Sequence, residues 1–284
     1  MTTDNPTLNA FDMAGKRGII FGVANERSYA WYITEALKNA GAECLFTHLP
    51  GEKNKKRVTR ALAALGIEDP WLFEFDAAND EDFDNLFDAV KEEFGTIDFI
   101  VHSIAYCDKD YLQVGQFSST PRKVWTQAME ISAYSLIAMG RHAVEVMPNG
   151  GSIISLSYYG AEKVVPGYNV MGVAKAALEH NTRYLAMELG SQNIRVNCIS
   201  GGPLRTLSAM AVGSIEQIMN HAEKFAPLRR NIDGSEAGNT ALFLLSRASS
   251  GITGEIVYLD AGYNILSNFP SCDCEPKPDE KPFY

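Results

Sequence analysis

The sequence of 284 residues lacks features that mark several large classes of protein. No apolar run approaches the roughly 18 residues that a membrane-spanning helix needs. The first residues, MTTDNPTLNAFDMAG, lack the basic and then apolar pattern of a secretory signal. Positive charge is also scarce, because 25 Lys and Arg stand against 35 Asp and Glu, a formal net charge of −10. We therefore expect a cytoplasmic protein whose main partner is neither nucleic acid nor a membrane.

Cysteine is scarce as well, and the count of five is odd, which argues against a disulfide framework. Cys44, Cys107 and Cys198 fall in or near expected strands, where a free thiol is the usual state. Cys272 and Cys274 form a C-x-C pair near the end of the chain. No second pair and no histidine follows them, so we predict no metal site.

The composition is that of an ordinary globular protein, with 46% hydrophobic and 21% charged residues. Short apolar runs alternate with segments of helical periodicity. The strands are expected at 17–21, 43–47, 71–75, 99–102, 152–156, 194–199 and 255–259, and the helices at 28–39, 54–65, 80–94, 122–144, 168–189 and 233–245. This order predicts an α/β fold: a single-domain, Rossmann-like, doubly wound parallel sheet of seven strands with helices on both faces. Its site should lie at the carboxyl ends of the strands.

The domain is expected to span residues 14–266, after an N-terminal arm at 1–13. Within it, the segment at about 204–228 is rich in Met, Ala and Leu and contains an internal glycine. We interpret it as a mobile lid over an apolar ligand, although two ordinary amphipathic helices would give the same pattern. Residues 267–284 contain four prolines and alternating charges, which is typical of an extended tail.

The sequence has no G-x-G-x-x-G fingerprint for a dinucleotide. Gly22 directly follows the first expected strand, and Ser28 and Ala30 begin the next helix. A strand, a glycine turn and a helix N-terminus can hold a pyrophosphate through free backbone N–H groups and the helix dipole. An ordinary connection between a strand and a helix would look the same.

The end of the second strand lacks the acidic residue that usually holds an adenosine ribose. His48 stands there, and no acidic residue follows before Glu52. Lys53 and its basic neighbours could contact a 2′-phosphate or form the solvated start of a helix. Asp76 ends the third strand and could meet an adenine amine, or it could cap the next helix, a role for which Asp80 competes.

The stretch from Ser157 to Lys175 carries three tyrosines, Tyr158, Tyr159 and Tyr168. Tyr168 and Lys175 are seven residues apart, which is about two helical turns, so they project from one face. An ammonium nearby lowers the pKa of a tyrosine from its ordinary value of about 10. The pair therefore suits a proton-donating site, but an amphipathic helix on which both side chains only pack has the same spacing.

Two divergent motifs occur together. Gly22, Ser28 and Ala30 form G-x5-S-x-A, and Tyr168, Met171 and Lys175 form Y-x2-M-x3-K. Over residues 15–265 the chain resembles the short-chain dehydrogenase/reductase superfamily, and within it the bacterial NADH-dependent enoyl-acyl carrier protein reductases. Supporting segments are HSIAY at 102–106, LSYYGAE at 156–162, RVNCISGGPLRTL at 195–207 and GEIVYLDAGY at 254–263.

The resemblance implies reduction of a trans-2-enoyl thioester by hydride transfer to C3, the last step of the fatty acid elongation cycle. Tyr168 would stabilise the resulting enolate. Lys175 would hold the hydroxyls of the nicotinamide ribose, and Tyr158 would help to position the thioester carbonyl. Tyr159 has no counterpart in the family pattern, and we interpret it as a packing residue.

The resemblance also implies the remaining contacts and partners. The cofactor residues would be Gly22, Ser28, Tyr29, His48, Asp76, Ala77, Ser103, Ile104, Ala105, Lys175, Leu204, Arg205 and Thr206, and the substrate residues Cys107, Tyr158, Tyr168 and Met210. Because no Lys or Arg directly follows Thr47, NADH is expected rather than NADPH. Acyl carrier protein would bring the substrate, and the enzyme would be a homotetramer with its long helices at the subunit interfaces.

Two other functions remain open. A 3-ketoacyl or enoyl-CoA reductase could use the same scaffold, and Ser155 lies thirteen residues before Tyr168, as a ketoacyl reductase would require. The seven-residue spacing to Lys175 and the extra Tyr158 argue against the ketoacyl reaction. A non-enzymatic nucleotide sensor would be expected to have lost some of these side chains.

Overall fold

Seven short apolar runs form the strands of one parallel sheet. In the computed structural model, which describes residues 8–267, the strand order is β3-β2-β1-β4-β5-β6-β7. The strands are β1 (Arg17–Ile20), β2 (Glu43–His48), β3 (Leu72–Glu74), β4 (Phe99–His102), β5 (Gly151–Ser157), β6 (Ile194–Gly201) and β7 (Ile256–Leu259). The chain reverses its direction of winding between β1 and β4, where doubly wound sheets bind their ligands. The expected seven-stranded, Rossmann-like α/β fold is confirmed.

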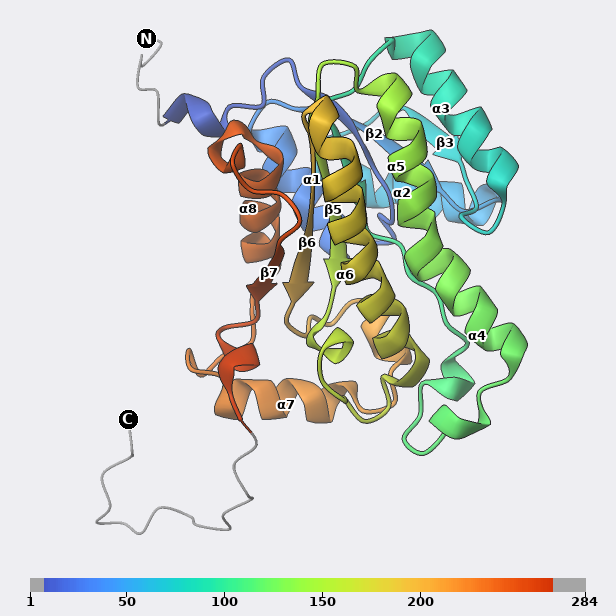
Figure 1. Cartoon of the computed structure of the whole chain (residues 1–284), viewed down its shortest axis with the longest axis vertical. Helices are drawn as coiled ribbons and strands as arrows, with labels where there is room; N and C mark the ends of the chain where they lie inside the picture. The colour runs from blue at the N-terminus through green and yellow to red at the C-terminus, as the bar shows by residue number, and fades with distance from the viewer. Residues whose placement is uncertain (1–7, 268–284) are drawn as a thin grey trace.

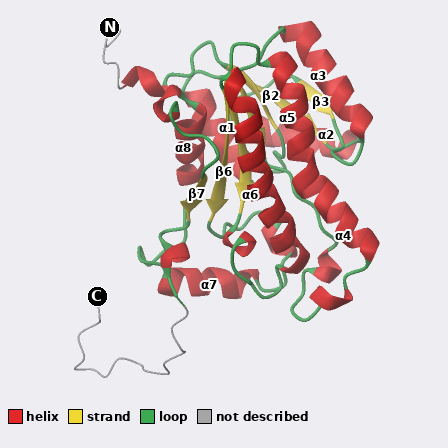
Figure 2. Ribbon diagram, in the orientation of Figure 1, coloured by secondary structure: helices red, strands yellow, loops and turns green. Residues whose placement is uncertain are grey.

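Helices cover both faces of the sheet (Figure 1). One layer holds α1 (Tyr29–Asn39), α2 (Glu52–Ala63) and α8 (Gly234–Leu245). The other holds α3 (Asp80–Phe94), α5 (Ser135–Val146) and α6 (Asn169–Leu189), with α4 (Arg122–Met129) leading into α5. The strand arrows in Figure 2 point towards α7 (Ile215–Phe225), which lies across the carboxyl edge of the sheet.

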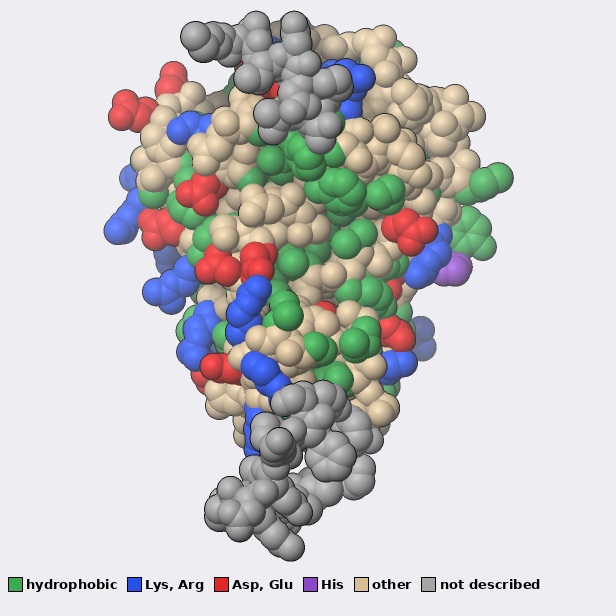
Figure 3. All heavy atoms as spheres, turned by 90° about the vertical axis from the view of Figure 1, so that its left-hand side faces the viewer, with side chains coloured by type: hydrophobic (Ala, Val, Ile, Leu, Met, Phe, Trp, Pro, Cys, Tyr) green, Lys and Arg blue, Asp and Glu red, His purple; other side chains and the backbone are tan. Residues whose placement is uncertain are grey.

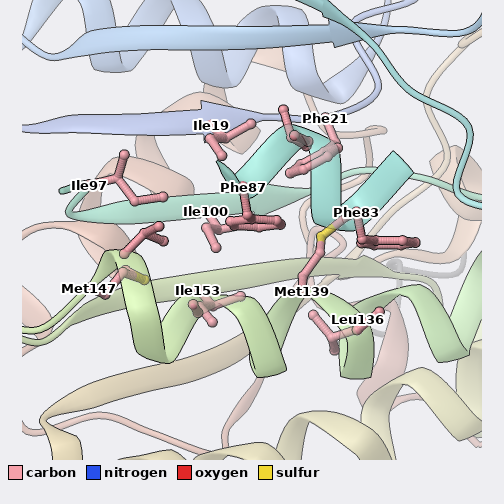
Figure 4. Close-up of a cluster of buried hydrophobic side chains, with 14 of the residues drawn as sticks. Ile19, Phe21, Phe83, Phe87, Ile97, Ile100, Leu136, Met139, Met147 and Ile153 are labelled. Atoms are coloured by element: carbon pink, nitrogen blue, oxygen red, sulfur yellow. The ribbon is translucent and has the colours of Figure 1, made fainter. Parts of the chain in front are cut away.

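The larger core lies between the sheet and the layer of α3, α5 and α6 (Figure 4). Ile19, Phe21 and Ile100 of the sheet meet Phe83 and Phe87 of α3 there. All five side chains are almost fully buried. Burial of an aliphatic or aromatic side chain contributes roughly 1.5–3 kcal/mol each. This core holds the sheet rigid while its carboxyl edge stays available for the site.

The helix expected at 122–144 is interrupted by a π-helical turn, Glu130–Tyr134. The turn places two buried serines against the end of β4 and the loop that follows it. The Ser132 hydroxyl accepts from the backbone N–H of Tyr106 at 3.0 Å, and the Ser135 hydroxyl lies 2.7 Å from His102 Nε2. Such turns are frequent at functional sites, and hydrophobic periodicity gives no sign of them.

The cap of α3 also differs from both expected candidates. Asn79 is the N-cap, and its side chain accepts from the backbone N–H of Glu81 at 3.2 Å. Asp76 lies before the cap, where its Oδ1 accepts from the backbone N–H of Ala78 at 3.0 Å. Asp80 is the first residue of the helix, so neither aspartate caps it.

The described part of the expected N-terminal arm packs against the domain. Within the expected arm, Phe11 lies against Phe243 of α8, and Met13 is buried in the core. Residues 1–7 and 268–284, which include most of the expected tail with Cys272 and Cys274, lie outside the described residues. In the region 8–267, no helix combines the length and the apolar character needed to cross a bilayer.

We predict that Gly22→Ala destabilises the protein more than Gly15→Ala does. Both glycines have positive φ, +88° and +75°, which costs an alanine roughly 1 kcal/mol. A Cβ on Gly22 would also collide with the backbone carbonyl of Ser103, whereas one on Gly15 would meet open space. Urea unfolding should show a loss of about 3 kcal/mol for G22A and about 1 kcal/mol for G15A. Equal losses would contradict the close approach of Gly22 to Ser103.

Candidate active site

The end of β5 and the start of α6 bring the two expected tyrosines together. Tyr158 follows the last residue of β5 in extended backbone, and Tyr168 is the N-cap of α6, one residue before the helix begins. Their rings meet edge to face, with centroids 5.0 Å apart. Gly160 lies beside the Tyr168 ring, and a Cβ there would overlap the ring. The arrangement presents two phenols at the carboxyl edge of the sheet.

Lys175 lies on the buried side of α6, two turns after Tyr168. Its Nζ donates to the backbone carbonyl of Leu156, in β5, at 2.6 Å. Burial lowers the pKa of this ammonium to about 8, and nearby Cys198 and Glu179 oppose that effect. The contact fixes α6 against the strand end that carries Tyr158.

The expectation that Lys175 lowers the pKa of Tyr168 is wrong. Burial raises the pKa values of both Tyr158 and Tyr168, because a phenolate would lose its hydration. Tyr158, Glu179 and Cys107 raise the pKa of Tyr168 further. The ammonium of Lys175 is directed to a backbone carbonyl. Both phenols are therefore neutral near neutral pH and can donate hydrogen bonds.

The turn after β1 has the geometry of an anion cradle. Gly22 adopts a φ of +88° and approaches the backbone of Ser103, at the end of β4. Ser28 is the N-cap of α1, but its hydroxyl donates to the carbonyl of Asn25 at 2.8 Å. The first turn of α1 has no acidic residue and no side-chain cap. The N–H of Trp31 donates to the carbonyl of Ser28 at 3.0 Å, which leaves the N–H groups of Tyr29 and Ala30 to a pyrophosphate, so these residues fit a dinucleotide.

Tyr29 joins this turn to the loop after β6. Its hydroxyl donates to the carbonyl of Gly202 at 2.5 Å. Leu204 packs nearby in a cluster with Ala226. Arg205 is exposed and pairs with Glu216 of α7 at 2.6 Å.

Thr206 belongs to the same loop. Its hydroxyl accepts from the backbone N–H of Ala209 at 3.0 Å. Leu204 therefore lies in one cluster with Tyr29 of the α1 turn, whereas Arg205 and Thr206 make their contacts within the predicted lid.

The end of β2 differs from the expectation that the His48 side chain contacts the adenosine half of a cofactor. His48 is buried, with its Nδ1 2.8 Å from the carbonyl of Leu49. Leu49 is instead the exposed side chain, at 57%. Ala77 is buried next to the half-buried Asp76 at the end of β3. A ligand at this edge would meet Leu49 before it met the His48 ring.

An apolar cluster adjoins the phenols. Leu112, Met171 and Val212 are buried together, and Cys107 and Tyr168 pack against them. Ser103, which Gly22 approaches, and Ile104, which packs against the larger core, are half-buried, and Ala105 is exposed. Met210, expected to contact substrate, is 62% exposed and lies outside the cluster.

Hydrogen bonds to backbone carbonyls hold three loops around this cluster. The Gly213 N–H donates to the carbonyl of Leu112 at 3.2 Å. The Ser214 hydroxyl donates to the carbonyl of Pro166 at 2.9 Å. Asn169 has a φ of +46°, and its side-chain amide donates to the carbonyl of Tyr111 at 2.8 Å. The predicted lid, the Cys107 loop and the start of α6 therefore meet beside Tyr168.

Two features of the site were missed in the sequence. Glu179 is buried on α6 and accepts from the Ser157 hydroxyl at 2.6 Å. It stands four residues after Lys175, so continuing the helical face would have found it. Tyr159 packs edge to face on Tyr263, which meets His221 of α7. No spacing in the sequence signals that long-range contact. No cluster of metal-ligating side chains occurs among residues 8–267.

We predict that Lys175→Met unfolds with at least wild-type stability at pH 7. The folded pKa of Lys175 is about 8 and its ordinary value is 10.5, so the folded state binds fewer protons between these values. Wild-type stability must therefore rise with pH from about 8 to 10.5, and the advantage of K175M must shrink.

Chemical unfolding of both proteins from pH 7 to 10.5 measures this difference. Lys55→Met, at an exposed position of α2, is the control and should show no such trend. A constant difference between wild type and K175M would show that Lys175 has no depressed pKa.

The sequence of this site is similar to that of known reductases. A family model described as enoyl-(acyl carrier protein) reductase matches residues 22–264. The chain is 48% identical over 256 residues to "Enoyl-[acyl-carrier-protein] reductase [NADH] FabI" of Synechocystis sp., covering 90% of this chain and 98% of that relative. It is 49% identical over 254 residues to "Enoyl-[acyl-carrier-protein] reductase [NADH] 1" of Rhizobium meliloti, covering 89% and 92%.

Solved structures agree with these relatives. The enoyl-acyl carrier protein reductase of Bacillus cereus, in complex with NADP+ and indole naphthyridinone, superposes with a TM-score of 0.87 at 44% identity, covering 90% of this chain and 100% of that one. The reductase of Anaplasma phagocytophilum in complex with NAD gives 0.85 at 45% identity, covering 90% and 96%. The chain belongs to the enoyl-(acyl carrier protein) reductase family.

Proposed function

We propose that this chain reduces the carbon–carbon double bond of trans-2-enoyl thioesters on acyl carrier protein, with NADH, in the last step of fatty acid elongation. The observation that carries the proposal is the meeting of two neutral phenols, Tyr158 and Tyr168, above a buried Lys175. The family membership over most of the chain supports the same reaction.

Bound NADH would supply a hydride to C3 of the enoyl chain. Gly22 and the uncapped start of α1 would hold the pyrophosphate. Ser103, Ile104 and Ala105 would lie along the nicotinamide ribose, whose hydroxyls Lys175 would bind. Leu204, Arg205 and Thr206 would approach the nicotinamide from the other loop, and Asp76 and Ala77 would lie at the adenine.

The chain's own part in the chemistry is to stabilise negative charge. The Tyr168 phenol would donate a hydrogen bond to the thioester carbonyl oxygen, which becomes an enolate oxygen when C3 is reduced. Tyr158 would hold the same carbonyl from the side, since its ring packs on Tyr168. Lys175 would add positive potential behind both phenols. Protonation of C2 then completes the saturated thioester.

Leu49 supports a preference for NADH. An exposed apolar side chain follows directly on β2, where the adenosine ribose would approach. A 2′-phosphate needs a close cation, and neither Lys nor Arg stands at position 48 or 49. The predicted role of His48 would then be to shape the strand end rather than to face the cofactor.

The acyl chain would lie in the cluster of Cys107, Leu112, Met171 and Val212. The segment 204–228 would act as its lid, within a single domain spanning 14–266. Met210 would meet the chain only if the lid moves, because it is exposed here. The substrate class and the family favour a cytoplasmic enzyme that receives its substrate from acyl carrier protein.

A 3-ketoacyl reductase reaction is less well supported. The serine that such an enzyme would need corresponds to Ser155, which is fully buried. Its hydroxyl lies 3.2 Å from that of Thr182 in the core. Ser155 therefore cannot reach a substrate beside Tyr168.

We predict that Tyr168→Phe lowers kcat for crotonyl thioester by about 100-fold or more, because one oxyanion donor is lost. NADH binding, followed by fluorescence, should change little. Wild type should reduce crotonyl but not acetoacetyl thioester, and should oxidise NADH in preference to NADPH. Tyr159→Phe is the matched control and should keep wild-type kcat. Full turnover by Y168F would refute the assignment of Tyr168.

We also propose that the enzyme is a homotetramer. The outer face of α5 and α6 exposes Ile137, Val144, Tyr184 and Met187, the last at 86%. Further apolar side chains gather on the face that includes α8 and the edge strand β7 (Figure 3), where Tyr258 is exposed. Exposed apolar side chains of this kind support subunit contacts.

We predict that Met187→Glu shifts the enzyme from tetramers to smaller species at micromolar concentration, measured by light scattering. A buried, unpaired carboxylate at an interface would be costly. Val164→Glu, at a position 96% exposed in a loop, is the control and should leave the tetramer intact. A tetramer that survives M187E would place the interface elsewhere.

A further inference from the structure

Two charged side chains on α6 are buried one helical turn apart. Lys175 and Glu179 are only 6% and 8% exposed. They contact consecutive residues of β5: Lys175 donates to the carbonyl of Leu156, and Glu179 accepts from the hydroxyl of Ser157, both at 2.6 Å. The next residue along the strand is Tyr158. Both charges therefore bind the strand end from which the substrate tyrosine projects.

A buried ammonium needs a counter-charge, since a single carbonyl does not offset the lost hydration. The groups that act on Lys175 come from three elements: His102 of β4, Cys198 of β6 and Glu179 of α6. Burial lowers the pKa of His102 to about 3 and raises that of Cys198 to about 12, so both are neutral near pH 7. Glu179 is left as the anion of this group.

The surroundings of Glu179 balance two opposing effects. Burial raises the pKa of its carboxyl, and Glu162 raises it further. The hydrogen bond from Ser157, the Arg183 guanidinium and Lys175 lower it. Glu179 in turn raises the pKa values of Tyr168 and Tyr258, as a nearby negative charge should. Although no direct ion pair joins Glu179 to Lys175, the low dielectric of the core lets their charges interact.

We propose that Glu179 is a positioning residue of the reductase: its carboxylate keeps Lys175 cationic in the core and, through Ser157, fixes the strand end that presents Tyr158. The inference rests on the proposed function, in which a cationic Lys175 supports the cofactor ribose and the enolate. It separates two roles for Glu179, an electrostatic one towards Lys175 and a geometric one towards Tyr158.

The test is the pH profile of kcat/KM for crotonyl thioester at saturating NADH. Wild type should lose activity as pH rises through about 8, where Lys175 loses its proton. In Glu179→Gln the amide oxygen can still accept from Ser157, but the charge is gone. Removal of a nearby opposite charge should move this alkaline limb down by about one pH unit. At pH 8 the kcat/KM of the variant should then be about fivefold lower than that of wild type.

Ser157→Ala removes the contact and keeps the charge. It should leave the alkaline limb in place and raise KM for the thioester, because Tyr158 is less well held. Ser200→Ala is the matched control: Ser200 lies opposite Ser157 in β6 and is buried, but its hydroxyl has no hydrogen-bond partner. It should change neither the limb nor KM.

Glu179→Asp keeps the charge but withdraws it by one methylene, so it should shift the alkaline limb less than E179Q does. It is the variant to measure if E179Q does not fold. An alkaline limb that stays at the wild-type position in the folded variants would overturn the inference. A wild-type enzyme that cannot reduce enoyl thioesters would instead overturn the proposed function, so the two failures are distinguishable.

Discussion

The hydrogen bond from Lys175 to the carbonyl of Leu156 sets the geometry of the whole site. The Lys175 ammonium loses its hydration when it makes this bond. That desolvation costs free energy, so the surrounding fold must be rigid enough to hold the bond. The contact prevents α6 from sliding along β5. Tyr158 comes two residues after Leu156, and Tyr168 comes two turns before Lys175, so one bond fixes both phenols.

The rest of the fold supports this bond through the close packing of the sheet against its two layers of helices. Buried side chains of α3 and α5 pack in one core with Ile100 of β4 and Ile153 of β5. Gly22 then allows the β1 turn to touch the end of β4. The result is a carboxyl edge with backbone N–H groups and two neutral phenols, and with the buried ammonium of Lys175 bound to the Leu156 carbonyl, which suits a reaction that generates negative charge.

Much of this could be predicted from the sequence, because alternating apolar runs fix a parallel sheet and parallel strands deliver their ends to one edge. The structure brings Tyr158 and Tyr168 of the stretch from Ser157 to Lys175 into contact, and the roles of these residues stay a prediction. The direction of the Tyr168 pKa was predicted wrongly, since spacing shows which side chains share a face but not how deeply they are buried. Burial decided the direction of the Tyr168 pKa, and it also turned His48 inward and left Leu49 exposed.

The π-helical turn at Glu130–Tyr134 has a consequence for how this family can vary. Such a turn holds about one residue more than an α-helical turn, so α4 and α5 are out of phase by roughly 100°. Deletion of a single residue there would restore an ordinary helix. It would also withdraw Ser132 from Tyr106 and rotate the outer face of one helix relative to the other. The phase between α4 and α5 is therefore coupled, through Ser132 and Tyr106, to the loop that follows β4.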